Sequence, residues 1–391
     1  MKEAVIVAGA RTPVTKANKG ALKNVRPEDL AAFSVKETLK RANMYDGYID
    51  DVIFGTAMPE AEQGLNISRN ISALAGVRFD APAITINRYC SSGLQSIAYA
   101  AEKIQLGQAK AIIAGGVESM SMVPMTGNTP RFHHKIVDDY PEYYTSMGQT
   151  AENVAIKYNI SREKQDVFAL NSHKKAYEAQ ISGKFDDEIV PIHYKLNTVV
   201  ADKLRTQIVI SDKDDGIRIN TNLETLGKLK PAFRANGTVT AGNSSQTSDG
   251  GASVLVMEKE YALSLGLKPL AKFKAFSVAG VRPEYMGIGP IEAIPRVLNY
   301  LNLSMKDIGL FELNEAFAAQ SIAVIEQLGL DENIVNVNGG AIALGHPLGC
   351  TGTKLSISLI NEMRRRNVQF GMVTMCIGGG MGAAGIFELI N

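Results

Sequence analysis

The chain repeats part of its own sequence, and this duplication limits the folds open to it more than any other feature. Segments in the first third resemble segments in the last third, and the matching positions keep their order. Five pairs share one offset of 259 residues (352 minus 93): Leu39 with Leu298, Ile49 with Ile308, Val52 with Phe311, Phe54 with Leu313, and Gly93 with Gly352. The alternative is two βαβ segments of generic composition. The fixed order favours two copies of one structural unit.

Short apolar strands alternate with amphipathic helices in both copies, a pattern typical of an α/β protein with mainly parallel sheets. Strands are predicted at 4–8, 111–114 and 253–257, and the end of a further strand at 84–87 resembles the segment 336–338. One helix follows Cys90 and ends near Gly107, and its apolar face consists of Leu94, Ile97, Ala98, Ala101 and Ile104. A second helix runs from Ser161, as its N-cap, to Ser182, with Gly183 as its stop.

The first copy is interrupted by a long polar stretch with proline-rich turns, which begins after the strand at 111–114. Strand character returns only at 253–257. We therefore predict three units. They are a first half formed by residues 1–119 and 246–268, an inserted loop domain at 120–245, and a second half at 269–391.

The composition excludes several classes of function. Lys and Arg number 41 and Asp and Glu number 40, so no strong net field favours binding to nucleic acid or to a membrane surface. No apolar run is long enough to span a bilayer. The N-terminal residues enter a strand at once, which leaves no room for a signal peptide, and three cysteines are too few for a disulfide framework. We expect a cytoplasmic protein with free thiols.

Two of the three cysteines stand where a catalytic thiol would be placed. Cys90 lies between a β-branched run and a helix, and Cys376 lies between a strand and the glycine-rich turn 377–382. A helix N-terminus or a cluster of glycine amides stabilises a thiolate, so both positions predict a stabilised anion and covalent chemistry. Cys350 occupies no such position, and we interpret it as structural. A metal site that combines Cys350 and Cys376 with His346 lacks a fourth ligand, so no metal is expected.

Two further segments offer side chains for acid–base chemistry. His346 lies between glycine and proline in the run Leu-Gly-His-Pro, which presents the side chain rigidly, as a general base beside a thiol requires. The other four histidines lie in hydrophilic stretches and are expected to be solvated: His133, His134, His173 and His193. Asn314 and Glu315 follow the apolar run 310–313, at the end of a strand where open α/β sheets place active-site groups. The alternative is that Asn314 caps a helix.

Five motifs in this order make the whole chain similar to the thiolase family: Asn87–Gly93 (Asn-Arg-Tyr-Cys-Ser-Ser-Gly), Gly115–Ser121 (Gly-Gly-Val-Glu-Ser-Met-Ser), Asn314–Phe317 (Asn-Glu-Ala-Phe), Asn338–Pro347 (Asn-Gly-Gly-Ala-Ile-Ala-Leu-Gly-His-Pro) and Cys376–Gly380 (Cys-Ile-Gly-Gly-Gly). The resemblance implies the thiolase fold. In that fold, two αβαβαββ halves form a five-layer αβαβα sandwich, and the inserted loop domain binds coenzyme A (CoA). Thiolases cleave 3-ketoacyl-CoA with a second CoA, or run the reverse condensation.

The resemblance also implies roles for the candidate residues. Cys90 takes the acyl chain as a thioester, His346 accepts its proton, and Cys376 exchanges a proton with the acetyl-CoA enolate. His346 and a water positioned by Asn314 form one oxyanion hole, while the backbone amides of Cys90 and Gly378 form the other. CoA is a co-substrate, and no permanently bound cofactor is expected. Substrate-binding positions carried over from the family are Arg218 at the nucleotide end, Ser244 and Ser245 near the pantetheine arm, Phe233 and Met147 along the channel, and Phe317.

One departure from the family pattern bears on the substrate. The acetoacetyl-specific branch commonly has His before Met-Gly, whereas here Ser146 precedes Met147. The smaller side chain favours the degradative branch, which acts on longer 3-ketoacyl-CoA in fatty acid β-oxidation. The alternative is an acetoacetyl-CoA thiolase that works in the condensing direction. The family further implies a homodimer or homotetramer with 3-ketoacyl-CoA, acetyl-CoA and CoA as ligands, and association with other β-oxidation enzymes.

Two relatives of different function are disfavoured. A decarboxylating ketoacyl synthase shares the duplicated fold but normally has His in place of the second cysteine, so Cys376 counts against it. A non-catalytic lipid carrier would be expected to lack Cys90, His346 or Cys376, and all three are present.

Overall fold

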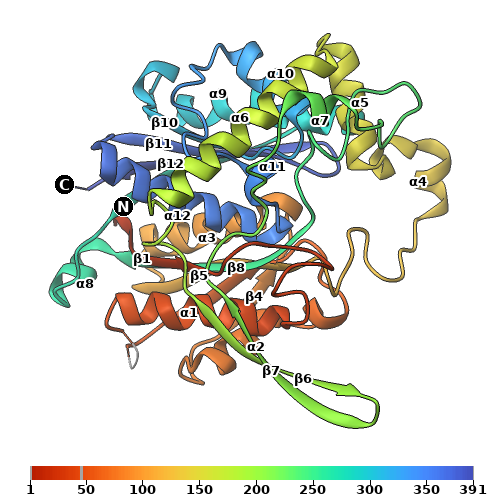
Figure 1. The fold of residues 1–391 in the computed structure, drawn as a ribbon. Coiled ribbons are helices and arrows are strands. Elements are labelled where there is room, and N and C mark those ends of the chain that lie inside the picture. Colours follow the sequence, from red (N-terminus) through yellow and green to blue (C-terminus); the bar gives the residue numbers. More distant parts are fainter. Residues whose placement is uncertain (1, 45–46, 391) are drawn as a thin grey trace.

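In the computed structural model, which describes residues 2–44 and 47–390, two halves of the chain repeat one order of elements (Figure 1). The elements of the first half are β1 (Ala4–Arg11), β2 (Thr15–Lys16), α1 (Pro27–Arg41), β3 (Asp51–Gly55), α2 (Ile67–Ala75), β4 (Ala83–Ile86), α3 (Ser92–Gln105), β5 (Ala111–Ser119) and β8 (Ser248–Glu258). Those of the second half are β9 (Ala271–Gly280), α9 (Gly289–Leu301), β10 (Leu310–Leu313), α10 (Ala318–Leu328), α11 (Ala341–Leu344), α12 (Leu348–Arg366), β11 (Phe370–Ile377) and β12 (Met381–Leu389). The short helix α8 (Lys259–Ser264) links them. The predicted duplication is confirmed.

The long strands form one mixed sheet in the order β10-β11-β12-β9-β1-β8-β5-β3-β4, with β2 paired to β8. In the first half, β3 pairs with β5 in parallel, and β5 pairs with β8 antiparallel. In the second half, β10 pairs with β11 in parallel, and β11 pairs with β12 antiparallel. The halves join only through a short pairing of β1 with β9, at Val5 with Lys272 and Ile6 with Ala271. The two halves therefore have the same strand order and meet at their first strands.

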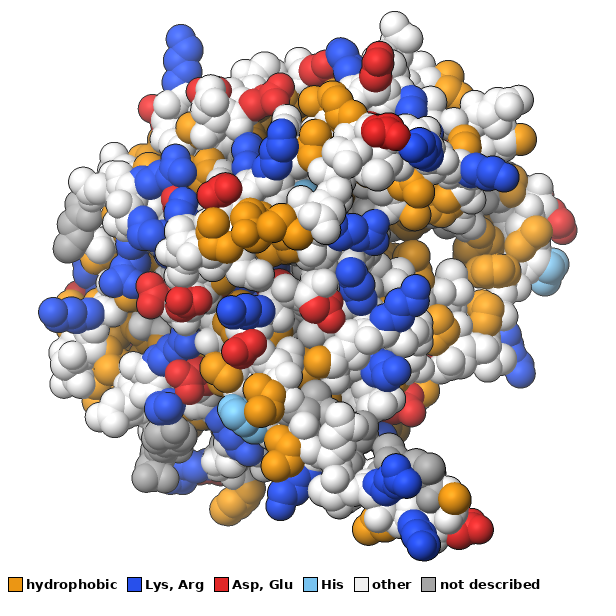
Figure 2. All heavy atoms as spheres, in the orientation of Figure 1, with side chains coloured by type: hydrophobic (Ala, Val, Ile, Leu, Met, Phe, Trp, Pro, Cys, Tyr) orange, Lys and Arg blue, Asp and Glu red, His pale blue; other side chains and the backbone are white. Residues whose placement is uncertain are grey.

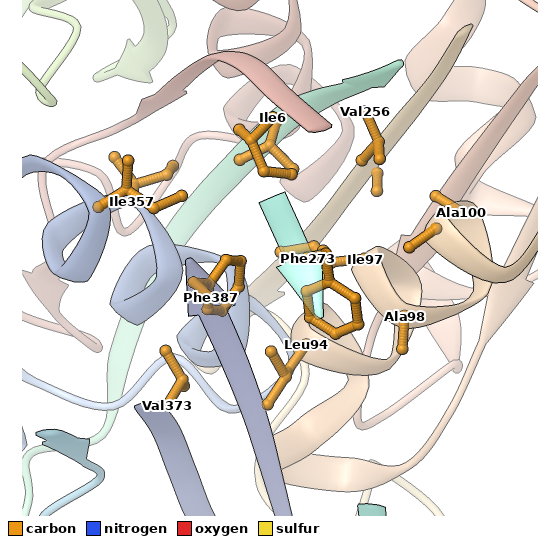
Figure 3. Close-up of a cluster of buried hydrophobic side chains, with 14 of the residues drawn as sticks. Ile6, Leu94, Ile97, Ala98, Ala100, Val256, Phe273, Ile357, Val373 and Phe387 are labelled. Atoms are coloured by element: carbon orange, nitrogen blue, oxygen red, sulfur yellow. The ribbon is translucent and has the colours of Figure 1, made fainter. Parts of the chain in front are cut away.

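Helices alternate with the sheet to give five layers (Figure 1). Helices α3 and α12 lie between the two halves of the sheet and share one apolar core with both, as Figure 3 shows for Leu94, Ile357, Phe273 and Phe387. Helices α1 and α2 cover the outer face of the first half, and α9 and α10 cover the outer face of the second. The expected five-layer sandwich is confirmed, because each half of the sheet has an apolar core on both faces.

The two central helices approach each other at the glycines that the duplication relates. A Cβ added at Gly93 would lie 2.6 Å from the hydroxyl oxygen of Thr353 and 2.8 Å from the carbonyl oxygen of Gly349. A Cβ added at Gly352 would overlap the backbone nitrogen of Leu94. Only glycine permits this backbone approach, which explains why the duplicated position carries glycine in both copies.

The second half lacks a full counterpart of β4 within the described residues. The segment 336–338, which resembles the end of β4 in sequence, is not a strand, and only Val335 beside it forms a bridge, to Phe311. Asn336 adopts φ +45°, in the left-handed region, so the chain leaves the sheet. Its side-chain amide accepts from the N–H of Leu313 at 2.8 Å and donates to the carbonyl of Leu313 at 2.8 Å. The main chain thus pairs with β10 only around Phe311, and the side chain of Asn336 supplies the hydrogen bonds to Leu313.

The residues between β5 and β8 form a separate set of helices and strands. They are α4 (His134–Asp139), α5 (Met147–Lys157), α6 (Arg162–Ile181), β6 (Ile192–Val200), β7 (Lys203–Ser211) and α7 (Leu223–Gly227). Helix α6 begins as predicted, because the Ser161 side chain accepts from the N–H of Lys164. The hairpin of β6 and β7 projects from the body (Figure 1).

A buried ion-pair network ties this set of elements to the first half. Arg11 of β1 is fully buried and lies 2.8 Å from Glu188 and 2.8 Å from Asp214. Each carboxylate flanks the β6–β7 hairpin, so both ends of the hairpin are fixed to one guanidinium.

Acidic and basic side chains are interspersed on the surface in Figure 2. None of the helices in the described ranges combines the length and the apolar character needed to cross a bilayer.

The glycine contact between the central helices leads to a stability prediction. Gly93→Ala forces a methyl group against Thr353 and Gly349, and overpacking of this kind costs about 1–3 kcal/mol in the free energy of unfolding. Urea-induced unfolding followed by circular dichroism measures the loss. Gly227→Ala is the matched control, since nothing lies within 4 Å of an added Cβ there. Equal stability of the two variants would contradict the close helix contact.

Candidate active site

A cavity of about 270 Å³ opens where the strand ends of both halves meet the inserted residues. Three side chains that can react chemically line it, each from a different segment of the chain: Cys90, His346 and Cys376. The rest of the wall is largely apolar and contains four methionines. These further lining residues include Met120, Met125, Ser146, Met147, Phe233, Ser244, Ser245, Gln246, Met286, Phe317 and Leu348. The structure therefore brings the three predicted catalytic side chains to one place.

Cys90 lies in a single 3₁₀ turn, Tyr89–Ser91, between the end of β4 and the start of α3. The residue before it, Tyr89, adopts φ +43°, which is costly for an aromatic residue and occurs mainly where the surroundings impose it. The turn leaves Cys90 only 8% exposed and facing the cavity. The backbone amides of Gly378 and of Cys90 itself lie close enough to its sulfur to lower its pKa. These are the two amides that the sequence analysis placed in the second oxyanion hole.

The resting thiols are neutral, which corrects the expectation of a stabilised thiolate. Burial raises the pKa of Cys90 to about 12, and the amides of Gly378 and Cys90 offset this only in part. Burial and then the neighbouring Cys90 raise the pKa of Cys376 far above its ordinary value. Burial lowers the pKa of His346 to about 3, with a smaller contribution from Lys354. Removal of water from around the charged forms therefore outweighs the amide dipoles, and the site holds a thiol beside a neutral imidazole.

Hydrogen bonds on both ring nitrogens hold His346 in place. Its Nδ1 lies 2.6 Å from the hydroxyl oxygen of Thr351, and its Nε2 lies 3.3 Å from Nδ2 of Asn314. The Thr351 hydroxyl also donates to the carbonyl of Pro347 at 3.2 Å, so we place the imidazole hydrogen on Nδ1. Nε2 then carries a lone pair that accepts from Asn314. Thr351 was not predicted, although it lies one helical turn beyond His346 at the start of α12.

Asn314 does not cap a helix, so that alternative is excluded. Helix α10 begins at Ala318 with Phe317 as its N-cap. Nδ2 of Asn314 contacts His346, whereas its Oδ1 is buried and has no hydrogen-bond partner among the described residues. A buried amide oxygen without a partner is costly, and a water that donates to it would satisfy it.

Glu315 has a structural role in this arrangement and does not line the cavity. Its carboxylate accepts from the hydroxyl of Ser172 at 2.6 Å, from Nδ2 of Asn336 at 3.0 Å and from the N–H of Ile342 at 3.3 Å. It therefore fixes the first turn of α11, four residues before His346. Of the pair Asn314 and Glu315, only Asn314 contacts His346.

Cys376 is the last but one residue of β11, and the turn after this strand contains Gly379 and Gly380 with φ +79° and +85°. Such a turn favours glycine, since other side chains are strained there. Gly378 precedes these two residues, and its backbone amide lowers the pKa of Cys90. Cys350 lies in α12, within the central apolar core, and does not line the cavity. The third cysteine is thus separated from the other two, as predicted.

Five of the six substrate-binding positions border the cavity: Met147, Phe233, Ser244, Ser245 and Phe317. The rings of Phe233 and Phe317 meet edge to face, with centroids 6.1 Å apart, and form one wall. The hydroxyl of Ser244 donates to the carbonyl of Thr240 at 2.7 Å and is occupied within the protein.

Arg218 does not border this cavity. It is exposed and lines a smaller hollow of about 60 Å³ with residues of α6, including His173. The backbone N–H of Arg218 donates to Nδ1 of His173, which is only 4% exposed. Burial, with the charges of Arg218 and Lys16, lowers the pKa of His173 to about 4. The prediction of a solvated His173 is wrong, because the ring packs under the segment that carries Arg218.

Glu118, inside the second sequence motif, joins the cavity segments of the two halves. One carboxylate oxygen accepts from the N–H of Ala57 at 2.8 Å and of Gly349 at 2.7 Å, and the other accepts from Nε2 of Gln63 at 2.6 Å. Gly349 lies three residues after His346, at the start of α12. A buried carboxylate with this number of donors fixes the chain segments around it. The sequence motif Gly115–Ser121 includes Glu118, but the sequence does not show which groups donate to its carboxylate.

Comparison with known proteins agrees with this fold. The family models described as "Thiolase, N-terminal domain" and "Thiolase, C-terminal domain" match residues 4–260 and 267–389. The two matches cover nearly the whole chain, so the chain belongs to the thiolase family. The family that the five motifs implied is confirmed.

Individual relatives are similar over their full length. The chain is 64% identical to the 3-ketoacyl-CoA thiolase of Bacillus subtilis (strain 168) and 45% identical to that of Shigella boydii, with 100% of each chain covered. Among solved structures, a Bacillus anthracis acetyl-CoA acetyltransferase has TM-score 0.91 at 42% identity, covering 100% of this chain and 99% of that one. Human mitochondrial 3-ketoacyl-CoA thiolase in complex with CoA has TM-score 0.89 at 37% identity, covering 100% and 98%.

The neutral resting site predicts how Cys90 reacts with pH. Because its pKa is raised to about 12, its thiolate fraction grows about tenfold per pH unit below that value. The rate of alkylation by iodoacetamide at Cys90, followed by peptide mass spectrometry between about pH 6 and pH 9, therefore rises without levelling. Buried Cys350 serves as the internal control for unfolding. A plateau near neutral pH would indicate a thiolate–imidazolium pair and contradict the neutral site.

Proposed function

We propose that this chain is a 3-ketoacyl-CoA thiolase, which uses CoA to cleave 3-ketoacyl-CoA into acetyl-CoA and a shortened acyl-CoA. One observation carries the proposal: Cys90, His346 and Cys376 line the same cavity, where the backbone amides of Gly378 and Cys90 favour the anion of the Cys90 sulfur. The names of the full-length relatives from Bacillus subtilis and Shigella boydii support it. CoA is a co-substrate in this reaction.

In the first half-reaction, the Cys90 thiol gives its proton to Nε2 of His346, which then no longer accepts from Asn314, and the sulfur attacks the keto carbon. The bond between that carbon and the α-carbon of the acetyl-CoA unit then breaks, and Cys90 keeps the acyl group as a thioester. The departing enolate oxygen accepts from protonated Nε2 of His346 and from a water held by the free Oδ1 of Asn314. Cys376 protonates the α-carbon, and acetyl-CoA leaves. Because Thr351 holds Nδ1, Nε2 is the nitrogen that first accepts the proton from Cys90 and then donates a hydrogen bond to the enolate oxygen.

In the second half-reaction, the Cys376 thiolate takes the proton of an incoming CoA thiol, and the CoA sulfur attacks the thioester. The developing oxyanion accepts from the amides of Cys90 and Gly378, which are already in position. Cys90 leaves as a thiolate and recovers its proton from His346, so both catalytic groups return to their starting state. A fixed donor of this kind is worth on the order of 3 kcal/mol in the barrier.

The inserted segment 120–245 supplies the CoA-binding surface in this proposal. Within this segment, Ser244 and Ser245 would lie near the pantetheine arm, and Met147 and Phe233 would line the channel; Phe317 of the second half borders the same cavity. Arg218 lies at the exposed surface, where a positive charge would meet the nucleotide phosphates. We further propose a cytoplasmic homodimer or homotetramer that acts with other β-oxidation enzymes.

The degradative branch is favoured over an acetoacetyl-CoA thiolase that works in the condensing direction. Ser146, the N-cap of α5, borders the cavity and occupies little of it. Four methionines line the same cavity: Met120, Met125, Met147 and Met286. Methionine side chains adapt to ligands of different shape, which suits acyl chains of several lengths. The likeness to the Bacillus anthracis acetyl-CoA acetyltransferase keeps the condensing enzyme as the second candidate.

The separate roles of the two cysteines lead to a test by substitution. Cys90→Ser abolishes thiolysis and acyl-enzyme formation but leaves the Kd for CoA nearly unchanged. Cys376→Ala lowers thiolysis by at least about a hundredfold, the usual contribution of a positioned acid–base group. It still accumulates an acyl adduct on Cys90 when it is mixed with an acyl-CoA, as intact-mass spectrometry would detect. An adduct on Cys376 in the Cys90→Ser variant would reverse the two assignments.

The small Ser146 side chain in the cavity wall leads to a test with substrates. Thiolysis of 3-ketoacyl-CoA with chains of C4 to C16, followed by loss of the ketoacyl-CoA absorbance, gives kcat/KM for each length. The degradative assignment predicts turnover well beyond C4. Strict preference for C4 would instead favour the acetoacetyl-CoA thiolase.

A further inference from the structure

Gln246 holds the turn before His346 with both its backbone and its side chain. Its backbone carbonyl accepts from the N–H of His346 at 3.1 Å. Its side-chain Nε2 lies 3.0 Å from the carbonyl oxygen of Ile342 and 3.2 Å from that of Ala343, in helix α11. One residue therefore contacts the main chain both at His346 and one turn before it.

The same side-chain nitrogen also reaches the inserted segment. Nε2 of Gln246 donates to the carbonyl of Gly216 at 2.9 Å, two residues before Arg218. The backbones approach closely here, since a Cβ added at Gly216 would overlap the carbonyl oxygen of Ala343. Three carbonyl oxygens, from two separate segments, thus converge on one amide group.

The turn that carries His346 depends on this support. Gly345 has φ +92°, a conformation that other residues rarely adopt, and a Cβ there would overlap the hydroxyl of Ser248. The Ser248 hydroxyl donates to the Gln246 carbonyl at 2.7 Å and accepts from the N–H of His346 at 3.2 Å. A strained backbone persists only where its surroundings fix it, and here residues 246 and 248 provide much of that fixation.

We propose that Gln246 is a positioning residue: its side-chain amide holds the 342–346 turn against the inserted segment and so sets the place of the His346 imidazole in the cavity. The inference rests on the proposed function, because it assigns the amide's effect to the acid–base step of thiolysis. An amide suits this position because it offers two N–H groups to carbonyl oxygens without carrying a charge. A carboxylate of the same shape would present only acceptors to them.

Two variants with a matched control test the proposal. Gln246→Met keeps the length of the side chain and removes its donors, and Gln246→Glu keeps the shape and replaces donors by acceptors. Displacing a catalytic group by a fraction of an ångström to 1 Å costs on the order of tenfold to a hundredfold in rate. We expect that loss in kcat for Gln246→Met and a larger loss for Gln246→Glu. KM for 3-ketoacyl-CoA stays within about threefold, as for a residue that acts on the reacting state.

Gln165→Met is the control. Gln165 is another buried glutamine, whose Nε2 donates to the carbonyl of Ile160 at 3.2 Å and to the hydroxyl of Thr238 at 2.9 Å, away from His346. This variant should lose thermal stability to a similar extent while kcat stays near the wild-type value. Equal kcat in Gln246→Met and Gln165→Met would overturn the proposal. A raised KM at unchanged kcat would also overturn it, since the amide would then bind substrate.

A crystal structure of Gln246→Met separates this inference from the proposed function. A displaced 342–346 turn supports the positioning role even if the wild-type protein fails to cleave 3-ketoacyl-CoA, which would sink the proposed function alone. An unmoved turn and imidazole would refute the role of Gln246, whatever the wild-type activity.

Discussion

The backbone contact between Gly116 of β5 and Gly349 of α12 sets how closely the two halves of the molecule approach. A Cβ at Gly116 would overlap the carbonyl oxygen of Gly349, so the contact exists only because Gly116 lacks a side chain; a Cβ at Gly349 would in turn overlap the backbone of Thr56. Gly93 and Gly352 make a similar contact between the central helices. The buried carboxylate of Glu118 then accepts from the N–H of Gly349 and fixes the junction. Close approach at these glycines is what allows side chains from both halves to share one cavity.

Burial at this junction has an electrostatic consequence for the chemistry. It keeps the Cys90 and Cys376 thiols protonated and the His346 imidazole neutral at rest. The fixed polar groups are the amides of Cys90 and Gly378 and the neutral side chain of Asn314. In the proposed mechanism, they favour the negative charge that develops on a bound carbonyl oxygen. The site thus stabilises charge as it forms and carries none beforehand.

Much of the fold and part of the site follow from the sequence. The duplication and the strand–helix alternation predict two α/β halves, and the position of Cys90 between a strand and a helix is visible in the sequence. The contacts of these residues are not visible in the sequence, because Thr351, Glu118 and Gln246 act through contacts that only the folded chain creates.

The predictions of a solvated His173 and of stabilised thiolates were wrong because they did not take burial into account. His173 has hydrophilic neighbours in the sequence but is buried under the segment that carries Arg218. Burial raises the pKa of Cys90 and Cys376, so their thiolates gain no net stabilisation. The segment 336–338 resembles the end of β4 in sequence but is not a strand, because Asn336 turns the chain out of the sheet and bonds to Leu313 through its side chain.

The central claim is that strand ends from both halves build one cavity in which Cys90 carries the acyl group and backbone amides receive its oxyanion. A crystal structure of the protein after brief exposure to an acyl-CoA tests this claim most directly. The account predicts a thioester on Cys90 whose carbonyl oxygen lies within hydrogen-bond distance of the amides of both Cys90 and Gly378. An acyl group on another residue, or a thioester oxygen directed away from these two amides, would contradict it.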